Sequence, residues 1–311
     1  MTQTLRILLN GLIDYAGLFP PAALDMNTAV ENYARYLMGD ERFALGRFIC
    51  PVSRLDELSR AAAALMPGTF ATSGYREMSI GLPAWRISAI IDAPLDECLS
   101  RIDAFNEHHA QMDHGRGCIE TIEMKIADAG DIDEALDIIP NDITPYFEIA
   151  TDCDPRGCIA ALAGESAGAK IRCGGVTPEA IPPIESVAAF LASCAAAGVA
   201  FKATAGLHHP IRAEQPLTYD PTPPRAVMHG FVNVFLAAAM LHERTIDESE
   251  ARALLADNEP GAFQFLDTEA RWRDYGIGAD ALERARAQFA TGYGSCSFEE
   301  PLADLRSLGW M

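Results

Sequence analysis

The regular alternation of strand-like and helix-like segments is the feature that most limits how this chain can fold. Short apolar runs are followed by stretches whose apolar residues recur with the helical period, and no linker separates one pair from the next. The expected strands are residues 12–19, 47–51, 86–92, 119–127, 145–150, 169–174, 200–207 and 262–267. The expected helices are residues 27–37, 54–65, 95–108, 132–138, 155–162, 186–197, 229–241 and 279–289.

Eight strand–helix units in a row predict an α/β protein, a single (β/α)8 TIM barrel spanning residues 1–311. An open, doubly wound sheet is the alternative, but no Gly-x-Gly-x-x-Gly turn follows the first expected strand. Two segments exceed the minimal barrel. One is a proline-rich loop after strand 7, residues 207–227, which we expect to lie over the mouth of the barrel. The other is a short C-terminal extension, residues 291–311, whose Glu299 and Glu300 we interpret as charge at a helix N-terminus.

Composition excludes several classes of partner. A net charge of −20 argues against nucleic acid and against anionic membrane surfaces. No run approaches the ~20 apolar residues of a membrane span, and the N-terminal apolar run lacks a signal-peptide pattern. The eight cysteines form no CxxC pair, so we expect free thiols and a cytoplasmic location. The oligomeric state is left open, and a homo-oligomer is compatible with the sequence.

Two neighbouring expected strands each carry one lysine and then run out into glycine. Lys170 belongs to the sixth strand and Lys202 to the seventh, with one helix between them. Parallel strands are buried on both faces, so a lysine there is costly unless it has a function or a partner. Two such lysines side by side indicate an active site.

The chemistry that two adjacent lysines favour is Schiff-base formation. Neighbouring strands lie ~4.8 Å apart, so the two ammonium groups could lie ~6 Å from each other. Their repulsion, roughly 2.8 kcal/mol at an effective dielectric of ~20, would lower the pKa of one of them by about two units. A neutral amine attacks a carbonyl carbon, and a nearby carboxylate moves the protons. Glu123, on the fourth expected strand, is the candidate for that carboxylate.

Other polar residues stand at the expected strand ends, where catalytic and binding groups of a barrel lie. We interpret them as substrate-binding residues: Asp14, Asp92, Glu148, Arg172, Thr204, His208 and His209. Despite the acidic chain, a basic patch of Arg172, Lys202 and His208 would bind an anionic group. The expected partner is therefore a small anionic oxo compound.

Residues 12–208 resemble the class I aldolases of the deoxyribose-phosphate aldolase group. The family patterns Ile-Asp-x-Thr-Leu-Leu-x-Pro and Glu-Ile-Asp-Met-Val correspond in order to Ile13-Asp14 with Leu18-Phe19-Pro20 and to Ile122-Glu123-Met124. Between them, the family pattern Cys-Val-x-Pro corresponds to Phe48-Ile49-Cys50-Pro51. The patterns Val-Lys-Thr-Ser-Thr-Gly and Val-Lys-Ala-Ser-Gly-Gly are matched by Lys170 with Gly174 and by Lys202-Ala203 with Gly206.

The resemblance implies that Lys170 is the Schiff-base lysine, Lys202 the activating lysine and Glu123 the proton shuttle in place of an aspartate. It implies no cofactor and no metal. The small polar residues that follow the family's nucleophile are replaced here by Ile171 and Arg172. The family's phosphate-binding end has no counterpart after His209, so the implied substrate differs from deoxyribose phosphate.

Two other hypotheses use the same barrel. A metal-dependent hydrolase or lyase would take its ligands from His208, His209 and Glu148, with His229 and Asp92 as further donors. A non-catalytic ligand-binding barrel would use the same cavity without chemistry.

Overall fold

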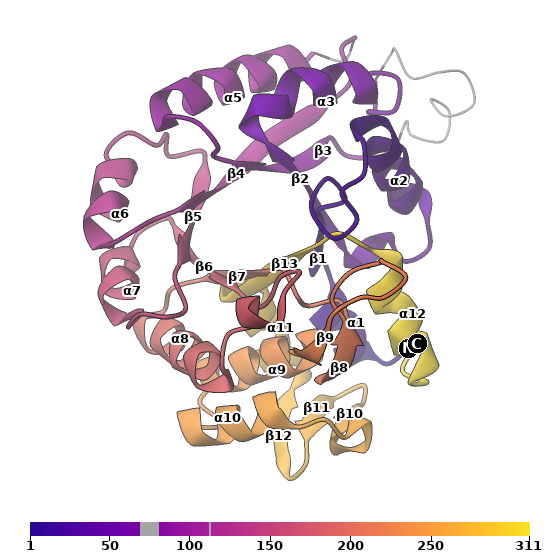
Figure 1. The fold of residues 1–311 in the computed structure, drawn as a ribbon, viewed down its shortest axis with the longest axis vertical. Coiled ribbons are helices and arrows are strands. Elements are labelled where there is room, and N and C mark those ends of the chain that lie inside the picture. The colour runs from indigo at the N-terminus through magenta and orange to yellow at the C-terminus, as the bar shows by residue number, and fades with distance from the viewer. Residues whose placement is uncertain (69–80, 112) are drawn as a thin grey trace.

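A closed barrel of eight parallel strands forms the centre of the molecule. The computed structural model describes residues 1–68, 81–111 and 113–311. Figure 1 looks along the barrel, whose strands follow the order β1-β13-β7-β6-β5-β4-β3-β2. The strands are β1 (Ile13–Tyr15), β2 (Leu45–Pro51), β3 (Trp85–Ile90), β4 (Gly117–Lys125), β5 (Thr144–Ile149), β6 (Gly168–Arg172), β7 (Phe201–Thr204) and β13 (Ala290–Ser295). The predicted (β/α)8 TIM barrel is confirmed.

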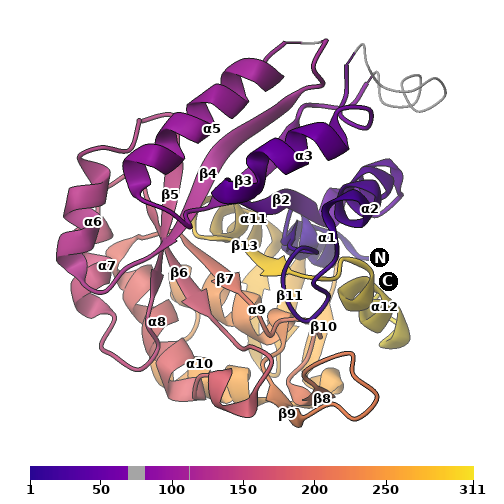
Figure 2. The same ribbon diagram turned by 45° about the horizontal axis from the view of Figure 1, so that its top comes forward.

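Helices surround the barrel on its outside (Figures 1 and 2). They bury one apolar side against the strands, as the helical period of the sequence predicts. The ring consists of α2 (Met26–Met38), α3 (Leu55–Ala62), α5 (Leu95–His109), α6 (Ala129–Leu136), α7 (Arg156–Leu162), α8 (Ile184–Ala197), α9 (Phe231–His242) and α12 (Glu299–Ser307). The other helices are α1 (Gln3–Leu9), α10 (Glu248–Ala256) and α11 (Ala279–Gln288).

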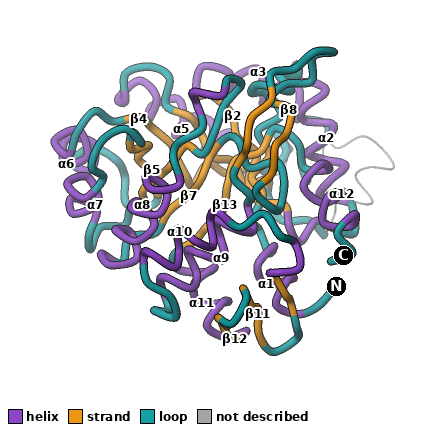
Figure 3. The backbone as a smooth tube through the Cα atoms, turned by 60° about the horizontal axis from the view of Figure 1, so that its bottom comes forward, coloured by secondary structure: helices purple, strands orange, loops and turns teal. Residues whose placement is uncertain are grey.

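The eighth strand is not where the sequence placed it, and the prediction of residues 262–267 is wrong. That region forms β10 (Phe263–Phe265), which pairs in an antiparallel sheet with β11 (Glu269–Trp272) and β12 (Tyr275–Gly278). This small sheet packs beside α1 and α11, away from the barrel (Figure 3). The barrel is closed instead by β13, which pairs with β7 on one side and β1 on the other. The segment expected as a C-terminal extension therefore supplies the eighth strand and, in α12, a helix after it.

The proline-rich segment after β7 contains a two-stranded hairpin. Its strands are β8 (Ala213–Pro216) and β9 (Arg225–Met228), paired antiparallel. The hairpin turn carries Tyr219, whose side chain is 58% exposed. A segment that the sequence predicts as irregular is therefore held in place by main-chain hydrogen bonds.

One helical segment of the described residues, Pro178–Ala197, is long and apolar enough to cross a membrane by length and composition alone. Its main part is α8, which packs against α7, α9 and α10 in the outer ring. All eight cysteines are free thiols, as expected.

Candidate active site

A cavity of about 1060 Å³ opens where the barrel strands end. Predicted site residues that line it are Asp92, Glu123, Glu148, Lys170, Arg172, Thr204, His208 and His209. Asp14 and Lys202 are not part of the lining, because both side chains are buried beneath it. Most of the site residues predicted from the sequence therefore line one cavity, and the other two lie in a buried layer beneath it.

The two lysines lie opposite each other on adjacent strands, as predicted, and they share one carboxylate. Lys170 is paired with Lys202 in the β6–β7 register. The Lys170 Nζ lies 2.9 Å from Glu123 Oε2 and 2.8 Å from Glu148 Oε2. The Lys202 Nζ lies 2.6 Å from Glu123 Oε1 and 2.6 Å from Asp14 Oδ2. Each ammonium group therefore has two carboxylate partners. Attraction to these carboxylates, rather than the expected repulsion between the two ammonium groups, is the main electrostatic interaction of the lysines.

The shared carboxylate is held ionised. Burial raises the pKa of Glu123, but the Lys170 and Lys202 ammonium groups and hydrogen bonds from Lys202 and Ser88 outweigh burial and hold it well below its usual range. For Glu148, burial again opposes the two nearest cations, Lys170 and Arg172, and the net effect lowers its pKa. Both carboxylates next to Lys170 are therefore ionised.

Lys202 is a fixed positive charge beneath the cavity. Its side chain is 1% exposed and its Nζ lies 5.5 Å from the centre of the Tyr146 ring. Burial lowers the pKa of Lys202, but the Asp14 and Glu123 carboxylates raise it by a larger amount. The pKa of Lys202 is therefore above its usual value. Asp14 is itself fixed by the Arg47 backbone N–H, at 2.6 Å. Because Lys202 is buried and paired, it does not belong to the predicted anion-binding patch.

Glycine follows each lysine strand because the two strand ends touch. A Cβ on Gly206 would lie 2.6 Å from the Gly174 Cα, closer than real Cβ atoms approach. Gly206 also has a φ of 71°, which favours glycine. Its neighbour Ala205 has a φ of 56° and lines the cavity, so backbone strain is held at the end of β7.

Arg172 reaches the cavity from the same strand as Lys170. Its Nε donates to Glu148 Oε1 at 3.0 Å, and 42% of its side chain is exposed. The described residues offer no acceptor within hydrogen-bond distance of its two terminal nitrogens. Arg172 is therefore only partly neutralised and can bind an anionic group.

Two histidine–carboxylate pairs stand on the β7–β13 side of the cavity. The His208 Nδ1 lies 3.1 Å from Glu300 Oε2, and the His209 Nδ1 lies 2.6 Å from Asp304 Oδ2. The Tyr219 hydroxyl donates to the same Glu300 oxygen at 3.1 Å. Tyr219 and Glu300 both line the cavity, and the sequence analysis missed both as site residues. Locating the eighth strand at residues 290–295 would have placed Glu300 just after its C-terminal end.

The remaining predicted residues have separate roles. Asp92 accepts hydrogen bonds from the Ser53 backbone N–H, at 3.0 Å, and from the Ser53 hydroxyl, at 2.5 Å. It thereby connects the ends of β2 and β3 at the edge of the cavity. Thr204 ends β7 and also lines the cavity.

The histidines proposed as metal ligands each contact a different partner. His208 and His209 each contact their own carboxylate, and the buried His229 lies 2.9 Å from the Pro182 carbonyl oxygen. Nowhere in residues 1–68, 81–111 and 113–311 do three His, Cys, Asp or Glu side chains form a group that could hold a metal ion. The donor arrangement therefore gives no support to a site built from His208, His209 and Glu148.

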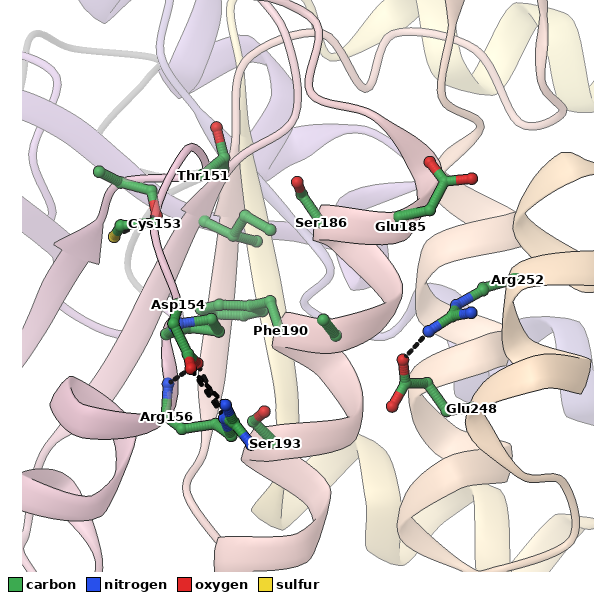
Figure 4. Close-up of a pocket in the computed structure, with 14 residues that line it drawn as sticks. Thr151, Cys153, Asp154, Arg156, Glu185, Ser186, Phe190, Ser193, Glu248 and Arg252 are labelled. Atoms are coloured by element: carbon green, nitrogen blue, oxygen red, sulfur yellow. Dashed lines mark hydrogen bonds and ion pairs between the residues drawn. The ribbon is translucent and has the colours of Figure 1, made fainter.

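A second cavity of about 450 Å³ lies on the outside of the barrel, between α7, α8 and α10 (Figure 4). Four of its charged side chains form two pairs, while Glu185 also lines it. Arg156 contacts Asp154, and Arg252 contacts Glu248 within α10. This leaves the cavity at the strand ends as the candidate active site.

No known protein-family model matches the chain, and no curated protein sequence is significantly similar to it. Its function must therefore be inferred from the cavity and its side chains.

Proposed function

We propose that the protein is a lyase of the class I aldolase type, in which Lys170 forms a Schiff base with an anionic oxo compound. One observation carries the proposal. Lys170 is a nearly buried lysine that lines a large cavity at the C-terminal end of a barrel strand and contacts two carboxylates able to take its proton. A second lysine, Lys202, lies behind those carboxylates.

The reaction begins with a proton transfer. The Lys170 ammonium group gives a proton to Glu123, and the neutral amine attacks the carbonyl carbon of the substrate. The carbonyl oxygen takes up two protons, one from the attacking amine and one from Glu123, and leaves as water, so an iminium ion remains. The substrate carries a hydroxyl group on its β-carbon, and a carboxylate of the site takes the proton of that hydroxyl. The bond between the α- and β-carbons then breaks and its electron pair enters the iminium, which gives an enamine and a released carbonyl compound. Protonation of the enamine and hydrolysis of the iminium then restore Lys170.

The network helps Glu123 to act as the proton shuttle. Two cations hold the pKa of Glu123 down, so it is a weak base while Lys170 is charged. When Lys170 becomes neutral, one of those cations is lost and the pKa of Glu123 moves back toward its usual range. Lys202 keeps its charge throughout and holds the carboxylate in place. The proton acceptor thus becomes stronger at the moment at which it is needed.

Arg172 supports an anionic substrate. It stands two residues after Lys170 on the same strand face, and His208 lies on the neighbouring side of the cavity. A carboxylate or phosphate held by the free terminal nitrogens of Arg172 would place an adjacent carbonyl near Lys170.

Borohydride trapping tests the proposal. Wild-type protein incubated with a panel of oxo acids and aldehydes, then reduced, should gain the mass of one substrate less the oxygen. Lys170→Met should gain none. Lys125→Met is the matched control, because Lys125 is an exposed lysine that lines the same cavity, and it should be trapped like the wild type.

Turnover separates catalysis from adventitious trapping. Glu123→Gln, shown to be folded by circular dichroism, should slow carbon–carbon cleavage by ~100-fold or more. Full activity in Lys170→Met would refute the proposal, and activity abolished by a chelator instead would favour the metal hypothesis. Ligand binding without any adduct or turnover would identify a non-catalytic binding barrel.

A further inference from the structure

The cavity is larger than a small oxo compound requires. Its volume of about 1060 Å³ lies at the upper end of the ~300–1,000 Å³ of sites that enclose drug-sized ligands. An oxo acid of three or four carbons would occupy only a small part of it. The size therefore indicates a ligand with a substantial second part.

The second part of the cavity is apolar. Most of the side chains that line it at the ends of β1, β2, β3 and β4 are apolar, and the charged residues at the ends of β3 and β4 are Asp92 and Lys125. We call these six residues the apolar arc: Phe19, Ile49, Ile90, Ile91, Leu95 and Met124. All except Ile49 are partly accessible, and exposed apolar surface of this kind gains free energy when a ligand covers it.

The apolar arc faces the reactive lysine across the barrel. In the closed strand order, β2 lies four strands from β6, and β3 lies four strands from β7. Ile49 therefore stands on the strand opposite that of Lys170 and Arg172, and Ile90 stands on the strand opposite that of Thr204. Leu217 and Met228, from the hairpin segment, add apolar surface on the polar side. A ligand attached at Lys170 that extends across the barrel reaches these apolar side chains, with Asp92 and Lys125 at their edge.

We propose that the substrate is amphipathic: an oxo acid whose carbonyl reacts at Lys170, whose anionic group binds Arg172, and whose alkyl or aryl group covers the apolar arc. The position of the carbonyl rests on the proposed function. The apolar group does not, because it follows from the cavity lining alone.

Binding of simple carboxylates tests the apolar group without any Schiff base. Isothermal titration with acetate, butanoate, hexanoate, octanoate and 3-phenylpropanoate should show affinity that rises with chain length. A buried methylene contributes ~0.8 kcal/mol, so each should tighten binding by roughly 4-fold. Arg172→Gln should weaken all members of the series by a similar factor, because each presents the same carboxylate.

A pair of isoleucine variants locates the effect. Ile91→Ser should weaken octanoate binding by at least ~5-fold and leave acetate unchanged. Ile138→Ser is the control, because Ile138 is 54% exposed and does not line the cavity. An affinity that stays flat along the series, or equal effects of the two variants, would overturn the inference.

The two proposals fail separately. If Lys170 is trapped but the carboxylate series is flat, the Schiff-base proposal stands and the amphipathic substrate is refuted. If the series rises and Ile91→Ser suppresses it, but no adduct forms, the amphipathic ligand is supported and the lyase is refuted.

Discussion

Six charged side chains in and under the cavity form one connected network, in which carboxylates and cations alternate. Its members are Asp14, Glu123, Glu148, Lys170, Lys202 and Arg172. Taking this many charges out of water costs more than filling the space with aliphatic side chains, so stability alone does not explain the network. The proposed Schiff-base chemistry, which needs a lysine beside proton acceptors, would account for it.

The lower layer of the network should be essential for stability. Lys202→Met leaves the buried Asp14 and Glu123 carboxylates without one of their cations, and we expect a loss of ~3–5 kcal/mol in the free energy of unfolding. Lys125→Met, at an exposed position, should change it by less than about 0.5 kcal/mol. Urea denaturation measures both. Equal effects of the two substitutions would show that Lys202 does not compensate those carboxylates.

The Glu123 carboxylate should make stability sensitive to acid. Its pKa is lower in the folded protein than its ordinary value of 4.5, so the unfolded chain binds the proton first. The contribution of Glu123 is therefore fully present above pH 4.5 and is lost as the pH falls below that value toward the folded pKa. Unfolding free energies between about pH 3 and 7 measure this loss. They should fall less steeply below pH 4.5 in Glu123→Gln than in the wild type, and equal slopes would contradict the assignment.

At the scale of elements, the hairpin β8–β9 is the part of the proline-rich segment that contacts the candidate active site. Its turn residue Tyr219 donates to Glu300, which in turn contacts His208. Most of the Tyr219 side chain remains exposed, so the contact contributes to the shape of the cavity more than to folding.

Removing this side chain should therefore alter binding without unfolding the protein. Tyr219→Ala should change the affinity for carboxylate ligands by about 5-fold, the effect of ~1 kcal/mol of contact, with an unchanged melting temperature. Val227→Ala is the control, because Val227 lies on β9 of the same hairpin, is 43% exposed and does not line the cavity. Unaltered affinity in Tyr219→Ala would show that the hairpin does not take part in ligand binding.

The sequence predicted the first seven strands because each combines an apolar run with a helix that follows it. It failed at β13, whose residues Ala290–Ser295 include Gly292 and Gly294 and lack a run of branched side chains. These glycines serve packing: a Cβ on Gly292 would lie 2.9 Å from the Leu12 carbonyl oxygen. Such crowding arises only in the closed barrel, so no local pattern could reveal it.

The sequence predicted site residues on the strands that it located, and it missed a residue that follows the strand it did not locate. Lys170, Lys202 and Glu123 were found because a charged residue stands out in a buried strand. The pairing of both lysines with Glu123 depends on side-chain positions across three strands, which sequence spacing does not give. Glu300 was missed because its strand was missed.

At the scale of the whole molecule, the last strand completes both the fold and the candidate active site. Strand β13 pairs with β7 and β1, and the segment after it brings Glu300 to the cavity. The cavity brings Lys125, Lys170 and Arg172 together with the carboxylates of Asp92, Glu123, Glu148 and Glu300. Arg172 is the cation there whose terminal nitrogens can hold an anionic group.

Closure by β13 predicts which proline substitution the fold tolerates. Tyr293→Pro removes the backbone N–H that donates to the Leu12 carbonyl oxygen at 2.9 Å, and we expect no cooperative unfolding transition. Tyr293→Phe keeps that N–H and the buried ring, so it should fold. Gln264→Pro disturbs only the pairing of β10 with β11 in the outer sheet, so it should keep a cooperative transition at a lower temperature. Calorimetry distinguishes these cases, and a cooperative transition in Tyr293→Pro would contradict the role of β13.

The most direct measurement is the position of the covalent adduct in the intact wild-type protein. Reduction with borohydride in the presence of an oxo acid, followed by proteolysis and mass spectrometry, assigns the modified lysine. We predict modification of Lys170, with Lys202 and the exposed Lys125 unmodified. An adduct on Lys125 or Lys202 in place of Lys170, or none with any carbonyl compound that binds the cavity, would contradict the proposed function.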